Sequence, residues 1–288
     1  MWSLSEFVQM AAHSYIYHPP QPRPSLQEFK LDTHNILINT VSADQVHCRL
    51  STPFGSMCTL SAYIPSSKII LFFHGNADDI NTCAAYAQWL ADSHACNVLT
   101  VDYPGYGYSS GTSNTSEEKM FYTAEALLEF ATHSLQHDIK TVMVLGKSLG
   151  SIPAIHLASQ AYAHDLLGLV LISPLASGAR CVMPNKKIPN SILQQLDQVF
   201  APNIIRITDV ESPILVVHGK HDSVVSCDNA DALLAATKTK TYYPPLFVEA
   251  DHNDIEAKFT SVVVNYIQDF TLFCMERKQA RSAYDDVE

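Results

Sequence analysis

From residue 68 onward, short apolar runs alternate with longer helical stretches, and this alternation constrains the fold more than any other feature. The runs are apolar throughout, as in parallel strands that are buried on both faces. Regular alternation of strand and helix is typical of a doubly wound α/β fold. We therefore expect strands at residues 69–73, 97–101, 141–145, 169–172, 214–217 and 246–249, and helices near residues 79–94, 116–136, 149–162, 227–237 and 254–275.

The chain before residue 68 follows a different pattern. Residues 35–39, 45–50 and 58–64 partly alternate apolar and polar side chains, which predicts short antiparallel strands at the N-terminal side of the sheet. Residues 18–24 contain four prolines and favour an extended chain, and residues 4–12 could form a short amphipathic helix. We interpret residues 1–30 as an N-terminal appendage.

The remaining domain boundaries follow from the same alternation of strands and helices. Residues 31–275 read as a single domain, and residues 276–288 as a C-terminal tail. The interval between the strands at 169–172 and 214–217 is long for a plain connection. We expect residues 176–212 to form a small cap-like insertion at the carboxyl edge of the sheet, where α/β proteins bind ligands.

Charge and cysteine content exclude several classes of protein. The chain has 18 basic and 29 acidic residues, a net charge of −11, which argues against a nucleic-acid partner. No apolar run is long enough for a transmembrane helix, and no signal peptide is evident. The seven cysteines are scattered and odd in number, as expected of free thiols in a reducing compartment. We expect a cytoplasmic protein, not a secreted one, with transient peripheral contact with membranes.

The strongest motif is Gly146-Lys-Ser-Leu-Gly150, which directly follows an apolar run and precedes a helix. This strand–turn–helix context is that of a nucleophile elbow, with Ser148 as the nucleophile. Larger residues in place of the two glycines would clash where strand and helix approach each other. A phosphate-binding loop would need a glycine at position 141, where the chain has Thr141.

A serine nucleophile needs a base, and the base needs an orienting acid. In this fold class the chain order is serine, acid, histidine. Asp222 follows the strand at 214–217, and His252 follows the strand at 246–249. Both loops open on the edge that carries the elbow, so we predict His252 as general base and Asp222 as the orienting acid. His221 and Asp251 are the neighbouring alternatives.

The tetrahedral intermediate also needs hydrogen-bond donors for its oxyanion. We predict the backbone N–H of Leu149, at the start of the helix, as one donor. The second should come from the turn after the strand at 69–73, where Gly75 permits close approach and the N–H of Asn76 is the candidate.

Together these residues resemble the α/β-hydrolase superfamily, and most closely its subgroup of α/β-hydrolase-domain protein depalmitoylases. The resemblance covers roughly residues 57–273. It rests on His74-Gly-Asn-Ala77, Asp102-Tyr-Pro-Gly-Tyr-Gly107, Gly146-Lys-Ser-Leu-Gly150, Ser173-Pro-Leu-Ala-Ser-Gly178, Phe200-Ala-Pro-Asn203, His218-Gly-Lys-His-Asp222 and Asp251-His-Asn-Asp-Ile-Glu256. It implies an α/β-hydrolase fold and a serine hydrolase that cleaves fatty acyl thioesters from protein cysteines at membranes.

Two features of the sequence differ from those of the subgroup. Its members typically carry an acylated cysteine cluster near the N-terminus, whereas residues 1–47 contain no cysteine. The elbow has Lys147 where the subgroup usually has glutamine; we interpret it as structural, although a cation there could attract anionic substrates.

The leading hypothesis is thus a hydrolase of acyl esters or thioesters, acting on acyl esters or S-acylated proteins through an acyl-enzyme. One alternative is a serine peptidase of the prolyl-oligopeptidase type, which shares the triad order but usually carries a large gating domain. Another is a non-catalytic interaction protein on a hydrolase scaffold, which loss of a triad residue would mark. No motif implies a metal or an organic cofactor.

Overall fold

The computed structural model describes residues 16–21, 24–27, 34–53, 66–109, 115–182, 189–238 and 242–285. The expected strand at 58–64 and the helix at 4–12 lie outside these residues. Within them, eight strands form one sheet in the order β1-β2-β4-β3-β5-β6-β7-β8. The strands are β1 (Asn35–Asn39), β2 (Gln45–Ser51), β3 (Ile69–Phe73), β4 (Asn97–Val101), β5 (Val142–Lys147), β6 (Gly168–Ile172), β7 (Ile214–Gly219) and β8 (Leu246–Val248).

The sheet is mostly parallel. Strands β3 to β8 pair in parallel, whereas β2 pairs antiparallel with both β1 and β4. The predicted α/β-hydrolase fold, with its N-terminal antiparallel strands, is confirmed. The helices are α3 (Ala84–His94), α4 (Glu117–Glu129), α5 (Ser151–Ala158), α6 (Gly178–Val182), α7 (Asn190–Leu196), α8 (Asn203–Arg206), α9 (Asp228–Ala236), α10 (Ile255–Lys258) and α11 (Thr260–Asp285).

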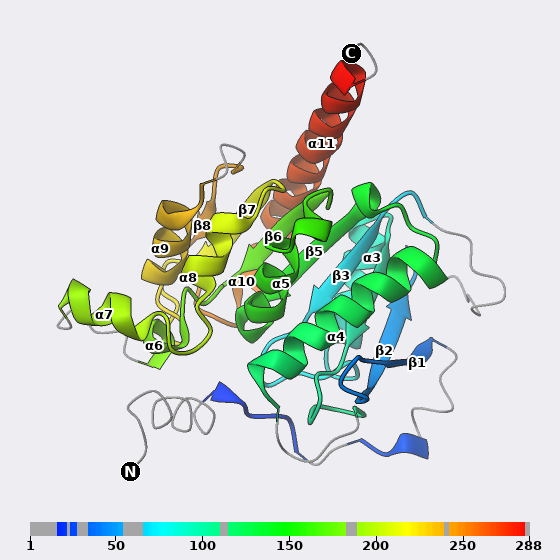
Figure 1. The fold of residues 1–288 in the computed structure, drawn as a ribbon, viewed down its shortest axis with the longest axis horizontal. Helices are drawn as coiled ribbons and strands as arrows, with labels where there is room; N and C mark the ends of the chain where they lie inside the picture. Colours follow the sequence, from blue (N-terminus) through cyan, green and yellow to red (C-terminus); the bar gives the residue numbers. More distant parts are fainter. Residues whose placement is uncertain are drawn as a thin grey trace.

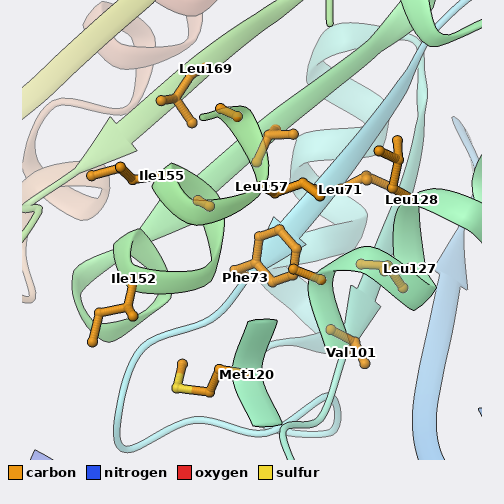
Figure 2. Close-up of a cluster of buried hydrophobic side chains, with 14 of the residues drawn as sticks. Leu71, Phe73, Val101, Met120, Leu127, Leu128, Ile152, Ile155, Leu157 and Leu169 are labelled. Atoms are coloured by element: carbon orange, nitrogen blue, oxygen red, sulfur yellow. The ribbon is translucent and has the colours of Figure 1, made fainter. Parts of the chain in front are cut away.

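Helices cover both faces of the sheet (Figure 1). Because side chains alternate along a strand, Leu71 and Phe73 pack on one face against α4 and α5, and this cluster is drawn in Figure 2. Ile70 and Phe72 point to the other face, in the cluster that contains buried residues of α3 and α11. Burial on both faces explains why these strands lack polar positions.

Two helices differ from the sequence expectation. The helix expected at 79–94 begins at Ala84, after a separate turn in which the Asp79 carboxylate accepts hydrogen bonds from the backbone N–H groups of Asn81 and Thr82. The helix expected at 254–275 is divided into α10 and α11 at Phe259.

Among the residues described, no helix is both long and apolar enough to cross a membrane. The six described cysteines are all free thiols, in agreement with the sequence analysis.

Candidate active site

Ser148 stands on a sharp turn at the carboxyl end of β5. Its φ of 51° lies in the left-handed region, which a residue with a side chain occupies only under constraint. Close packing around the same turn requires glycine at both flanking positions. A Cβ at Gly150 would lie 2.0 Å from the carbonyl oxygen of Phe73, and one at Gly146 would lie 2.6 Å from the carbonyl oxygen of Gly150. The steric reason given for both glycines in the sequence analysis is therefore confirmed.

The structure brings the three predicted triad side chains into one hydrogen-bonded series. His252 Nε2 lies 3.0 Å from Ser148 Oγ, and His252 Nδ1 lies 2.7 Å from Asp222 Oδ2. Both His252 and Asp222 are buried. The loops after β5, β7 and β8 thus meet although 104 residues separate Ser148 from His252.

Asp222 is held by more than His252. Its Oδ1 accepts hydrogen bonds from the backbone N–H groups of Val224 and Val225, at 3.0 and 2.7 Å. On its other side, His218 Nε2 lies 3.2 Å from Oδ2 and 2.8 Å from the carbonyl oxygen of Val225. Burial raises the pKa of Asp222, but the hydrogen bonds from His218 and His252 outweigh it, so the pKa lies well below its ordinary value. Asp222 is therefore ionised at neutral pH.

The two neighbouring alternatives lie elsewhere. His221 is exposed and pairs with Glu249, at 2.7 Å. The carboxylate of Asp251 accepts hydrogen bonds from the backbone N–H and hydroxyl of Ser223 and from the backbone N–H of His252. Asp251 thereby joins the Asp222 loop to the His252 loop. Its hydrogen bond to His252 is with the backbone N–H and not with the imidazole.

Asn76 and Leu149, the predicted oxyanion residues, both line the cavity that contains Ser148 and His252. The side chain of Asn76 is fixed, because its Oδ1 accepts hydrogen bonds from Tyr106 Oη at 2.6 Å and from the backbone N–H of His18 at 2.8 Å. The backbone of this loop is thus held in place beside the serine, as an oxyanion donor requires.

The loop after β4 supports the loop that carries Asn76. Asp102 is buried and accepts hydrogen bonds from the backbone N–H groups of Ile80 and Tyr108. Tyr103 Oη donates to the carbonyl oxygen of His74 at 2.8 Å. Burial raises the pKa of Asp102 to about 7. The contacts of this loop thus hold the Asn76 loop in place.

The cavity beside Ser148 has a volume of about 310 Å³ and a largely aliphatic wall. Its apolar side chains are Ile16, Ala77, Leu149, Leu175, Val224 and Val225, with Cys181 from α6. Of the described residues of the 176–212 insertion, which we expected at this edge of the sheet, Cys181 alone lines the cavity. Phe200 of the insertion instead packs against Gly178, where a Cβ would meet its ring at 2.1 Å.

The sequence analysis did not identify two residues that contribute to the site. His218 was within a quoted motif, and its place four residues before Asp222 was the available signal. Ile16 lies in the segment interpreted as an appendage, and no local pattern links it to the site. Among the described residues, no group of three histidine, cysteine, aspartate or glutamate side chains is arranged to bind a metal ion.

The comparisons with known proteins agree with this geometry. The Hydrolase_4 family, described as serine aminopeptidase, S33, matches residues 65–205. Alpha/beta hydrolase domain-containing protein 17C of Homo sapiens is 32% identical over 201 residues, which are 69% of this chain and 57% of the relative. Protein 17B of Xenopus laevis is 32% identical over 203 residues, 69% of this chain and 65% of the relative. The chain thus spans less than two thirds of the length of these relatives.

Solved structures show the same fold at lower identity. The Pyrococcus furiosus esterase Pf2001 superposes with a TM-score of 0.65 at 17% identity, covering 88% of this chain and 97% of the esterase. A putative lipase of Acinetobacter baumannii gives a TM-score of 0.57 at 16% identity, covering 88% and 96%. From its sheet order, its relatives and these structures, the chain has the α/β-hydrolase fold and is similar in sequence to the alpha/beta hydrolase domain-containing proteins 17.

Proposed function

We propose that this protein is a serine hydrolase that cleaves acyl esters or thioesters through an acyl-enzyme. The observation that carries the proposal is the hydrogen-bonded series from Ser148 through His252 to Asp222, at 3.0 and 2.7 Å. In such a series the hydroxyl is poised to lose its proton to the imidazole as it attacks a carbonyl carbon.

The roles follow from the contacts. Ser148 Oγ forms a bond to the acyl carbon while His252 Nε2 takes its proton. Asp222, ionised and bonded to Nδ1, orients the ring and stabilises the imidazolium. The backbone N–H groups of Leu149 and Asn76 bind the oxyanion. His252 then gives its proton to the departing oxygen or sulfur, which leaves the acyl-enzyme. The same imidazole next activates a water molecule, which hydrolyses the acyl-enzyme, releases the acid and restores Ser148.

The cavity supports an apolar acyl group. Aliphatic side chains line it, and its polar groups are those of the elbow, the Asn76 loop and the loop of His252. The resemblance to protein depalmitoylases adds S-acylated proteins as the candidate physiological substrates. We also propose that the protein is cytoplasmic and contacts membranes transiently, because a net charge of −11 disfavours electrostatic attachment to an anionic membrane surface. Fractionation of cells would test this: a salt-resistant membrane pellet would contradict it.

A fluorophosphonate probe tests the proposed chemistry. The parent chain should be labelled at Ser148 and should hydrolyse p-nitrophenyl esters and acyl-CoA thioesters, whereas Ser148→Ala should lose labelling and several orders of magnitude in turnover. Aminoacyl p-nitroanilides should be included, because the matched family is described as an aminopeptidase. Faster cleavage of the anilides than of the esters would favour a peptidase instead.

A further inference from the structure

Residues 16–18 precede the whole sheet, yet they contact the candidate site. The side chain of Ile16 is buried and lines the cavity that contains Ser148 and His252. This short stretch is the first part of the chain drawn in colour in Figure 1. A segment so distant in sequence reaches the cavity only if specific contacts hold it there.

One of these contacts is to the Asn76 loop. The backbone N–H of His18 donates to Asn76 Oδ1 at 2.8 Å, and Tyr106 Oη donates to the same oxygen at 2.6 Å. The two donors leave the amide of Asn76 with one orientation. The segment is thereby joined to the loop proposed to bind the oxyanion.

The second contact is to the 176–212 insertion. Tyr17 is buried, and its ring meets the ring of Phe200 edge-on, with 6.0 Å between the centroids. Such edge-to-face aromatic pairs stabilise a contact beyond the area that they bury. Because Phe200 in turn packs against Gly178, Tyr17 connects the segment to the base of α6. Ile16 is thus next to a residue that is anchored in the core.

Several of the other apolar side chains of the cavity belong to the catalytic scaffold. Leu149 follows the nucleophile on the elbow, Leu175 follows β6, and Val225 donates its N–H to Asp222. Changes at these positions would disturb the triad or the sheet. Ile16 lines the same cavity from outside the strands and the loops that carry the triad, as Cys181 of α6 does with a smaller side chain.

We propose that Ile16 is a specificity-determining residue, whose side chain limits the length of the acyl chain that the cavity accepts. The proposal rests on the acyl hydrolase activity proposed above. Ile16 is β-branched and buried, so it has little freedom to move aside for a longer chain. Its volume therefore decides how many methylene groups fit between the serine and this wall.

Two substitutions of opposite size test the proposal in the full-length chain. The measured quantity is kcat/KM for p-nitrophenyl dodecanoate divided by that for p-nitrophenyl butanoate. Ile16→Ala should raise this ratio by about tenfold, and Ile16→Phe should lower it by about as much, since a methylene group in a pocket is worth roughly 10- to 200-fold. Ile16→Val, which removes one methyl group, should raise the ratio by less than Ile16→Ala does, and it provides a variant that is less disruptive to folding than the larger changes.

Ile38 provides a matched control. It is an isoleucine on β1 with 7% exposure, against 5% for Ile16, and it does not line the cavity. Ile38→Ala should leave the ratio unchanged even if it lowers stability. A ratio that is the same in all Ile16 variants, or that moves equally in Ile38→Ala, would overturn the role of Ile16.

Labelling of Ser148 by a fluorophosphonate distinguishes a failure of the proposed role of Ile16 from a failure of the proposed function. If the parent chain is labelled and hydrolyses esters while the ratios stay constant, only the role of Ile16 is wrong. If the parent chain is neither labelled nor active on any ester, the proposed function is wrong and the role of Ile16 falls with it.

Discussion

Lys147 Nζ lies 2.9 Å from Glu256 Oε1, so the cation next to the nucleophile is paired with a carboxylate on α10. The two side chains are 18% and 11% exposed, and the ammonium group also lies 5.1 Å from the centre of the Tyr86 ring. The pair joins the elbow to the helix that follows the His252 loop. A cation held in this way is poorly placed to attract anionic substrates, which favours the structural interpretation of Lys147.

We predict that Glu256→Gln lowers the free energy of unfolding by about 1–3 kcal/mol, because it leaves a half-buried ammonium group without its partner. Urea denaturation measures this change. Lys147→Met combined with Glu256→Leu should cost less than Glu256→Gln alone, since no buried charge remains. A double variant that is less stable than Glu256→Gln would contradict this account.

Asp222→Asn should lower kcat by about 10⁴-fold near neutral pH, because the amide can neither fix the tautomer of His252 nor stabilise the imidazolium. Ester hydrolysis under saturating substrate measures the loss. Asp251→Asn is the matched control, with an expected loss of about tenfold or less, because Asp251 acts on the backbone of His252 and on Ser223. If Asp251→Asn were the more damaging change, the acid would have been assigned to the wrong residue.

His218→Phe should lower kcat by about 10- to 100-fold while Ser148 remains reactive toward fluorophosphonates. The phenyl ring fills a similar volume but removes the donor that lies 3.2 Å from Asp222 Oδ2 and 2.8 Å from the carbonyl oxygen of Val225, a loss of roughly 1–3 kcal/mol. Steady-state kinetics with one ester would measure it. An unchanged kcat would mean that the Val224 and Val225 N–H groups and His252 suffice to hold the carboxylate.

Asp102 predicts a pH-dependent contribution to stability. Its folded-state pKa of about 7 lies above the usual 3.8, so folding favours the protonated carboxyl. The contribution is complete below about pH 4 and is lost as the pH rises through 7. The unfolding free energy of the parent chain minus that of Asp102→Asn should therefore fall between pH 4 and 8, by up to about 4 kcal/mol. Chemical denaturation across this range measures the difference, and a difference that rises with pH would refute the prediction.

The sequence was most informative where the local pattern and the final environment coincide. Residues 69–73 and 97–101 are strands with the predicted bounds, because an uninterrupted apolar run is what a strand between two helical layers requires. Ser148, Asp222 and His252 were identified for a similar reason: parallel strands carry the loops after their carboxyl ends to one edge. The structure brings all three together there.

What the sequence did not reveal depends on contacts between distant residues. Residues 80–83 form a separate turn capped by the Asp79 carboxylate, which accepts from Asn81 and Thr82 as it would at the start of a helix, so the local pattern does not distinguish the two. Ile16 carries no sign of its position, since proline-rich neighbours favour an extended chain without saying where it lies. Its place follows from Tyr17 against Phe200 and from His18 on Asn76.

The left-handed conformation of Ser148 has a consequence for how this chain can change over evolutionary time. Glycine adopts a φ of 51° at little cost, whereas a residue with a side chain loses roughly 1–3 kcal/mol there. Ser148→Gly should therefore melt at a higher temperature than Ser148→Ala. Selection for folding alone would favour glycine at this position. Ser148 therefore lowers the stability of the fold while it provides the reactive hydroxyl.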